Sequence, residues 1–258
     1  MRLDVAVFAR GLAESRQKAQ LLIDAGCVFV QGKPIRKSSF TVSDDAEIHL
    51  EGELPLPYVG RGGLKLEGAL REFGISPSGL IAADIGASTG GFTDCLLQNG
   101  AKKVYAIDSG REQLHPSLRA DPRVVSMEEC NAKTLSESLL GEWVDLAVMD
   151  VSFTSQTVLY AAINAILKPD GMLISLIKPQ FEVGKSGIGK KGIVRDSKQH
   201  FKACSYVLDT AEQCGLFAQN FMRSPILGGE GNAEFIALFS RILPRKIRTN
   251  EVKKIAYQ

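Results

Sequence analysis

Short apolar runs alternate with segments of helical periodicity from residue 64 to residue 240. The apolar runs predict strands at 80–84, 103–108, 124–126, 144–150, 171–177, 216–222 and 233–240. Apolar residues three and four positions apart predict helices at 64–73, 92–97, 134–139, 155–166 and 197–214. Because strands and helices alternate, we expect an α/β fold with a doubly wound parallel sheet, its last two strands forming a hairpin at one edge.

The first fifty residues have a different pattern. Two short amphipathic helices are expected, the first ending near Gly11 and the second running from Arg16 to Ala25 with Ser15 as its cap. A strand at 27–30 follows, so this part should form a small α+β unit. We expect four segments: a unit at 1–50, a proline-containing linker at 51–60, the large domain at 61–240, and a basic tail at 241–258 without a core signal.

Composition narrows the class of protein. The 258 residues are 45% hydrophobic, with a net charge of only +2, which is ordinary for a globular protein. Five cysteines without a C-x-x-C pair suggest a reducing compartment and no metal site. The N-terminus lacks the apolar core of a signal peptide, and no run approaches the roughly eighteen apolar residues of a membrane helix. We therefore expect a cytoplasmic protein that does not bind membranes.

Charge is unevenly distributed in the first unit. Residues 1–43 carry seven basic side chains against three acidic ones, and residues 44–53 carry five acidic side chains and no basic one. A basic edge of this kind suits a phosphate backbone, although a merely solvated face would have the same composition. The candidate RNA-binding residues are Arg2, Arg10, Arg16, Lys18, Lys33, Arg36 and Lys37.

The stretch 80–93 carries the most informative pattern. An apolar run ends at Asp84, and a turn rich in small residues, from Gly86 to Gly91, precedes the helix that begins near Phe92. A dinucleotide would place its pyrophosphate beside Asp84, where the carboxylate would repel it. S-adenosylmethionine has no phosphate and carries two cationic groups, so it fits better. A plain strand-to-helix turn in another α/β protein is the alternative.

Charged residues follow four of the expected strands: Asp84, Asp108, Asp150 and Lys178. The carboxyl ends of parallel strands meet at one edge of a sheet, where ligands and catalytic groups gather. Asp108 lies about twenty residues past the first glycine, as suits a carboxylate that binds ribose hydroxyls. The irregular run at 180–196, rich in glycine and lysine, suits a mobile substrate loop.

Two resemblances follow from these residues. The pattern of Arg2-Leu3-Asp4, Gly11-Leu12-Ala13, Ser15-Arg16, Leu22-Ile23, Gly26 and Val30-Gln31-Gly32 resembles the S4 RNA-binding domain. The segments 58–66, 84–93, 149–153, 177–182 and 231–235 resemble the TlyA-type "hemolysin" family, S4-linked ribosomal RNA 2′-O-ribose methyltransferases whose catalytic domain is similar to FtsJ. The segment 108–112 is more charged than is usual in that family.

The resemblance implies a Rossmann-like methyltransferase sheet, S-adenosylmethionine as cofactor, and ribosomal RNA or ribosomal subunits as partner. It implies methylation of a cytidine 2′-OH in the RNA of the large subunit, with the small subunit as a further target in a longer branch of the family. The implied catalytic tetrad is Lys65, Asp150, Lys178 and Glu234. The implied cofactor-binding residues are Asp84, Gly86, Ser88, Thr89, Gly90, Gly91, Phe92, Asp108, Asn131 and Asp150.

The chemistry leaves the role of Lys178 open. A ribose 2′-OH must lose its proton as it attacks the methyl group, and Lys178 can accept that proton only in its neutral form, which a nearby cation such as Lys65 would favour. Alternatively, a charged Lys178 hydrogen-bonds the developing alkoxide. Asp150 and Glu234 would favour the charged lysine, so the four residues should behave as one coupled cluster.

Two functions of other classes compete with the enzyme. A pore-forming hemolysin would need amphipathic membrane segments, and none is evident in the sequence. A non-catalytic RNA-binding or ribosome-assembly protein would need only the S4 unit and the basic tail. The complete cofactor loop and the four tetrad positions argue against this second alternative.

Overall fold

The computed structural model describes residues 1–13, 16–52, 57–184, 187–189, 192–228, 231–242, 247 and 249–257, apart from the side chains of residues 17, 18 and 21. The chain divides into two compact units, Met1–Pro57 and Tyr58–Gln258. The division falls within the expected linker. Tyr58 is buried in the core of the second unit, so the chain enters that unit before residue 61.

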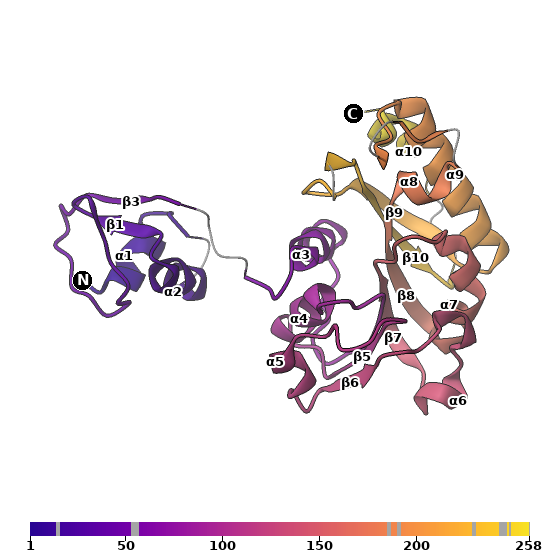
Figure 1. Ribbon diagram of the computed structural model, residues 1–258, viewed down its shortest axis with the longest axis horizontal. Coiled ribbons are helices and arrows are strands. Elements are labelled where there is room, and N and C mark those ends of the chain that lie inside the picture. The colour runs from indigo at the N-terminus through magenta and orange to yellow at the C-terminus, as the bar shows by residue number, and fades with distance from the viewer. Residues whose placement is uncertain are drawn as a thin grey trace. The chain divides into compact units, whose positions relative to one another are not determined.

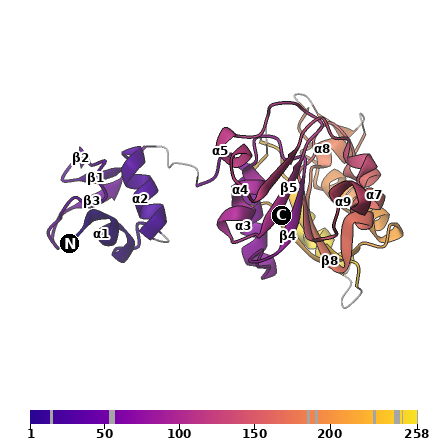
Figure 2. The same cartoon turned by 90° about the horizontal axis from the view of Figure 1, so that it is seen from below.

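The N-terminal unit combines two helices with a small antiparallel sheet. Its elements are α1 (Leu3–Ala9), α2 (Arg16–Ala25), β1 (Val28–Val30), β2 (Lys33–Pro34) and β3 (Ile48–Leu50), with the sheet order β2-β1-β3 (Figure 2). Leu3, Val7 and Ile23 are buried against Val28 of the central strand. The expected cap of α2, Ser15, lies outside the described residues.

The second unit is built on a seven-stranded sheet with the order β6-β5-β4-β7-β8-β10-β9 (Figure 1). The strands are β4 (Ile81–Ile85), β5 (Lys103–Ile107), β6 (Val124–Met127), β7 (Val144–Met149), β8 (Leu167–Ile177), β9 (Phe217–Arg223) and β10 (Phe235–Ser240). The first five strands are parallel. β10 is antiparallel to both β8 and β9, which confirms the predicted hairpin and places β9 at the edge.

Helices cover both faces of this sheet (Figures 1 and 2). One face carries α3 (Gly62–Phe73), α4 (Gly91–Gln98) and α5 (Pro116–Arg119). The other carries α6 (Glu137–Leu140), α7 (Tyr160–Ile166) and α9 (Ser197–Gln213), with the short η1 (Ala132–Thr134), η2 (Gln156–Leu159) and α8 (Pro179–Glu182) in the connections. Apolar clusters on the two faces confirm a doubly wound sheet.

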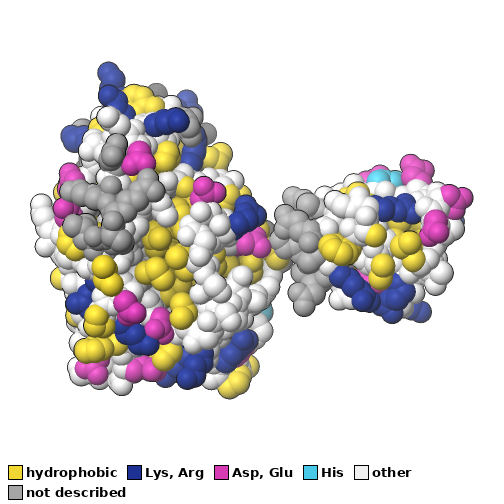
Figure 3. Space-filling view, turned by 180° about the vertical axis from the view of Figure 1, so that it is seen from behind, with side chains coloured by type: hydrophobic (Ala, Val, Ile, Leu, Met, Phe, Trp, Pro, Cys, Tyr) yellow, Lys and Arg dark blue, Asp and Glu magenta, His cyan; other side chains and the backbone are white. Residues whose placement is uncertain are grey.

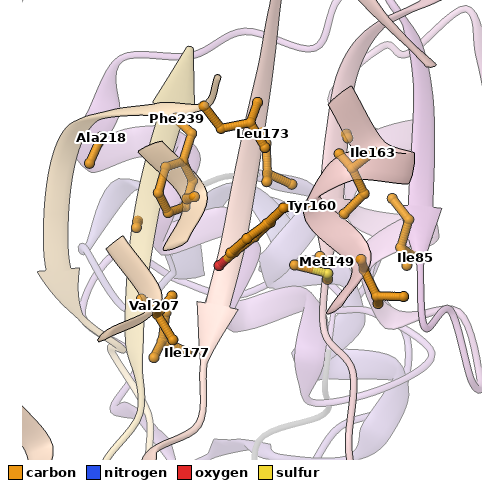
Figure 4. Packing of buried hydrophobic residues seen from close by; sticks show 14 of the residues in the cluster. Ile85, Met149, Tyr160, Ile163, Leu173, Ile177, Val207, Ala218 and Phe239 are labelled. Carbon is orange, nitrogen blue, oxygen red and sulfur yellow. The ribbon is translucent and has the colours of Figure 1, made fainter. Parts of the chain in front are cut away.

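The core beneath α7 and α9 is centred on an aromatic residue with a polar end. Figure 4 shows Tyr160 among Met149, Leu173 and Phe239. Its hydroxyl donates to Gln156 Oε1 at 3.0 Å, which satisfies the buried oxygen. Gln156 Nε2 reaches the carbonyl of Leu176 at 3.4 Å, so this polar group links the start of η2 to the end of β8.

The C-terminal segment corrects one expectation. The sequence of residues 241–258 carries no core signal, but α10 (Thr249–Ala256) buries Val252 and Ala256 in the same apolar cluster as α9. The backbone N–H of Ile247 donates to the carbonyl of Ala218 in the edge strand β9, at 3.1 Å. Two apolar positions within a run of basic residues are too weak a signal to predict this packing.

Candidate active site

The site lies where the strand order reverses. β4 pairs with β5 on one side and with β7 on the other, and in open α/β sheets ligands bind outside the carboxyl ends at this point. The turn after β4 requires a glycine: Gly86 has a φ of 83°. A Cβ at Gly86 would lie 2.8 Å from the carbonyl oxygen of Asp150, so the two strand ends touch here.

Asp84 lies behind this turn and is fully buried. Its Oδ2 accepts from the backbone N–H of Thr93 at 2.9 Å and from the Thr93 hydroxyl at 2.7 Å, which fixes the start of α4. Burial is the main cause that raises the pKa of Asp84 to about 7; the Thr93 hydrogen bonds oppose the rise, and the carboxylates of Asp150 and Asp108 add to it. Asp84 Oδ1 accepts no hydrogen bond from any residue that the structure describes.

A cavity of about 760 Å³ opens in front of the turn, along the ends of β4, β5 and β7. Gly86, Ser88, Asp108, Asn131 and Asp150 line it, so five of the predicted cofactor-binding residues share one space. Both oxygens of Asp108 already accept backbone hydrogen bonds, from Ser88 at 2.8 Å and Gly110 at 2.7 Å. These bonds fix the carboxylate at the cavity wall and leave lone pairs for a ligand.

A second cavity, of about 230 Å³, lies beside the first. Gly86, Ser88, Asp150 and Ser152 line both cavities, so the two are adjacent at the end of β7. Thr89, Gly91, Phe92 and Lys178 line the second cavity only. All the predicted cofactor-binding residues lie within the described part of the chain. Asp84 and Gly90 are the two of them that line neither cavity. They shape the turn instead: Gly90 is left-handed, and a Cβ there would meet Leu118.

The tetrad that the sequence suggested divides into two ion pairs. Lys178 Nζ lies 2.6 Å from Asp150 Oδ1, and both side chains border the second cavity. Lys65 Nζ lies 2.7 Å from Glu234 Oε2. The structure thus gives each lysine its own carboxylate.

The second pair is buried. The side chains of Lys65 and Glu234 are 10% and 2% exposed, so Lys65 is not the surface lysine that its position early in α3 would suggest. Neither of the two is among the described residues that line the two cavities. A Cβ at Gly228 would come within 2.0 Å of Glu234 Oε1, so a glycine is needed beside the carboxylate.

Sequence reasoning missed residues at the end of β7. Ser152 lines both cavities and accepts a hydrogen bond from Lys178 Nζ at 2.7 Å. The neighbouring Phe153 is 92% exposed, has a φ of 63°, and its ring centroid lies 5.4 Å from that of Phe181. Their position directly after a strand-end acid was a signal that could have indicated them.

The predicted RNA-binding residues lie on the N-terminal unit, where basic side chains gather along one edge and acidic ones along another (Figure 3). Arg2 Nε and Arg16 Nε lie 3.0 and 2.9 Å from the buried carboxylate of Asp4. Both guanidinium groups remain about half exposed. They hold the pKa of Asp4 far below its ordinary value, together with a hydrogen bond from Gln20. A buried carboxylate therefore orients two exposed cations.

The other predicted cations differ in their surroundings. Arg10 donates to the carbonyls of Ala46 and Asp44, and Arg36 donates to the carbonyl of Asp24, so both also tie the unit together. Lys33 and Lys37 are exposed. The side chain of Lys18 lies outside the described residues.

The expected substrate loop at 180–196 is described only in part, and Lys185, Ser186, Lys190 and Lys191 lie outside the described residues. It begins as α8, and its far end is fixed. The backbone N–H of Val194 donates to Asn232 Oδ1 at 3.1 Å, and His200 Nε2 lies 2.8 Å from the Val194 carbonyl.

Within the described part of the chain, no helix is long and apolar enough to cross a membrane.

Known proteins share both units. Residues 58–241 match the FtsJ-like methyltransferase family, and residues 1–48 match the S4 domain. Hemolysin A of Brachyspira hyodysenteriae is 44% identical over 93% of this chain and 99% of its own. The 16S/23S rRNA (cytidine-2′-O)-methyltransferase TlyA of Mycobacterium tuberculosis is 41% identical, over 91% and 87%.

The structural comparison agrees. A solved hemolysin-like protein of Streptococcus thermophilus is 41% identical, with a TM-score of 0.76 over 100% of this chain and 94% of its own. Solved methyltransferases at 15–16% identity share the fold of the second unit alone. The match to the family spans the whole seven-stranded sheet with its strand-end residues, and the chain therefore belongs to the FtsJ-like methyltransferases that carry an N-terminal S4 domain.

Proposed function

We propose that this protein transfers a methyl group from S-adenosylmethionine to the ribose 2′-OH of a cytidine in the ribosomal RNA of the large subunit. The observation that carries the proposal is the Lys178–Asp150 pair on the wall of the second cavity, which shares four lining residues with the first. Such a pair can accept a proton from a hydroxyl group, or hydrogen-bond the resulting alkoxide, next to a bound methyl donor. Relatives named as rRNA (cytidine-2′-O)-methyltransferases, including TlyA of Campylobacter jejuni at 37% identity, support the choice of substrate.

The residues around the first cavity fit the cofactor. Asp108 is fixed for the ribose hydroxyls of the adenosine, and the close turn at Gly86 admits the methionine end. Oδ1 of the buried Asp84 has no hydrogen-bond donor among the described residues, and it provides negative potential beneath that turn once the carboxyl is ionised, which suits a cation. When bound, S-adenosylmethionine supplies an electrophilic methyl group on a positively charged sulfur.

The chain's own residues handle the acceptor. Lys178 receives the 2′-OH at the second cavity. As the C–O bond forms, a neutral Nζ takes up the hydroxyl proton, whereas a charged Nζ donates to the developing alkoxide. Asp150 holds Nζ at 2.6 Å and balances its charge. The buried Lys65–Glu234 pair joins α3 to the residue that precedes β10.

The N-terminal unit supplies sequence-independent affinity for the RNA. Arg2 and Arg16, oriented by Asp4, and the exposed Lys33 and Lys37 are its phosphate-binding groups in this proposal. A cytoplasmic location follows from this substrate.

The experiment is direct. Purified protein is incubated with unmethylated ribosomal subunits and isotope-labelled S-adenosylmethionine, and the RNA nucleosides are identified by mass spectrometry. The proposal predicts labelled 2′-O-methylcytidine. Label on a nucleobase would contradict the ribose assignment, and absence of label with intact RNA binding would favour a non-catalytic RNA-binding protein.

A further inference from the structure

Two short segments border the proposed acceptor cavity and contact each other repeatedly. One follows β7 and runs from Asp150 to Gln156, and the other follows β8 and runs from Lys178 to Glu182. The ion pair between Lys178 and Asp150 and the contact between the tilted rings of Phe153 and Phe181 join the two segments. A third connection lies at their far ends.

That third connection is made by Glu182. Its Oε2 accepts from the Ser155 hydroxyl at 2.6 Å, and its Oε1 accepts from the backbone N–H of Gln156 at 3.0 Å. Burial raises the pKa of Glu182. A partly buried carboxylate with two donors from the other segment holds α8 against the start of η2.

Between these connections lies Ser152, the hydrogen-bond acceptor that the described residues provide for Lys178. A lysine side chain is long and flexible, and an ion pair sets mainly a distance. A hydrogen bond also sets a direction, because it weakens steeply when it is bent. The Asp150 carboxylate therefore fixes how far Nζ can move, and the Ser152 hydroxyl fixes where it points.

The backbone next to Ser152 is strained. Phe153 has a φ of 63°, a conformation that costs a bulky residue on the order of 1–3 kcal/mol and persists only where the surroundings enforce it. The Phe181 contact and the Glu182 hydrogen bonds are such surroundings. The strain turns the chain at the point where the serine hydroxyl meets Lys178.

We infer that Ser152 is a positioning residue for Lys178, held in place by the Phe153 turn and the Glu182 connection. It aims Nζ at the acceptor hydroxyl in the second cavity. This inference rests on the proposed function and assigns a role to a residue outside the four-residue set.

The test compares Ser152→Ala with Ser152→Thr, which keeps the hydroxyl, and with Ser138→Ala, an exposed serine outside the site. Single-turnover methyl transfer to ribosomal subunits is measured at saturating cofactor and RNA, with both affinities determined separately. Ser152→Ala should be slower by about 10- to 100-fold, the scale of a misplaced reacting group, with affinities for cofactor and RNA within about twofold of wild type. Ser152→Thr and Ser138→Ala should stay within about threefold of wild type.

The outcomes distinguish failure of the proposed function from failure of the positioning role of Ser152. A wild-type protein that transfers no methyl group contradicts the proposed function. With an active wild type, an equally fast Ser152→Ala variant overturns the positioning role alone. So does a Ser152→Thr variant as slow as Ser152→Ala, because the rate would then not depend on the hydroxyl.

Discussion

Two lysines of the methyltransferase unit have the same chemistry and very different surroundings. Lys178 is paired with Asp150 at a cavity wall, where one side of Nζ can face a substrate. Lys65 is paired with Glu234 in the interior. The Lys178–Asp150 pair is placed to exchange a proton with a substrate. The Lys65–Glu234 pair is placed to stabilise the fold.

Breaking the buried pair should destabilise the second unit. Lys65→Ala and Glu234→Ala should each lower the free energy of unfolding by about 3–5 kcal/mol, because each leaves an uncompensated buried charge. The double replacement Lys65→Met with Glu234→Leu should cost much less than the sum of the single variants. Urea unfolding followed by the fluorescence of Trp143, the chain's one tryptophan, measures the second unit. Additive losses would contradict a buried, coupled pair.

Asp84 makes cofactor binding depend on pH. Its pKa is raised to about 7, so the carboxylate that attracts a cation is mostly absent at pH 6 and mostly present at pH 8. Affinity for S-adenosylmethionine should therefore increase about tenfold over this range, with protons released on binding near pH 7. Calorimetry in buffers of different ionisation enthalpy measures both. Asp84→Asn should abolish the pH dependence, and an unchanged dependence in that variant would assign it to another group.

The raised pKa of Asp84 also affects the stability of the ligand-free protein. Cofactor affinity increases with pH, whereas this contribution to stability decreases with pH. A neutral Asp84 is favoured in the fold, so its contribution to stability is fully present below the ordinary pKa of 3.8 and is lost as pH rises through about 7.

At the scale of elements, the turn between β4 and α4 determines the site, because it brings two strand ends into contact. Gly86→Ala should weaken cofactor binding and lower stability by about 1–3 kcal/mol, since its Cβ would meet the Asp150 carbonyl in a left-handed backbone. Gly141→Ala is the matched control: its φ of 80° is similar, but its Cβ would meet nothing within 4 Å. Equal loss of cofactor affinity in both variants would show that backbone strain alone is responsible.

Some features of the helices and strands could be predicted from the sequence, and others could not. The strands and their terminal charges were predictable, because a buried parallel strand is a continuous apolar run and its end is marked by Asp84, Asp108, Asp150 or Lys178. The packing of α10 was not, because Val252 and Ala256 find their partners only in the folded sheet edge. The bond from Lys178 to Ser152 lies next to a left-handed backbone at Phe153, which no local propensity indicates.

At the scale of the molecule, each unit brings a different contribution: the second has the chemistry, and the first has the oriented cations. Asp4→Asn tests the first contribution. Removing a negative charge should by itself tighten RNA binding. We expect the opposite result: without Asp4 to orient Arg2 and Arg16, binding should weaken by roughly 1–2 kcal/mol. RNA affinity is measured at a temperature at which circular dichroism shows the variant folded.

Asp24→Asn provides the control, because it makes the same charge change at an exposed position of the same unit. It should leave affinity unchanged or slightly increased. If Asp4→Asn bound RNA as tightly as Asp24→Asn, the two arginines would not need the buried carboxylate.

The central claim is that Lys178 acts in the chemical step while the neighbouring cavity binds the cofactor. Single-turnover methyl transfer by Lys178→Ala tests it most directly, with Lys102→Ala, an exposed lysine just before the amino end of β5, as control. The account predicts a loss of about 10²–10⁴-fold for Lys178→Ala, with affinities for S-adenosylmethionine and RNA close to wild type, and no loss for Lys102→Ala. A Lys178→Ala variant that still transfers the methyl group at the wild-type rate would contradict it.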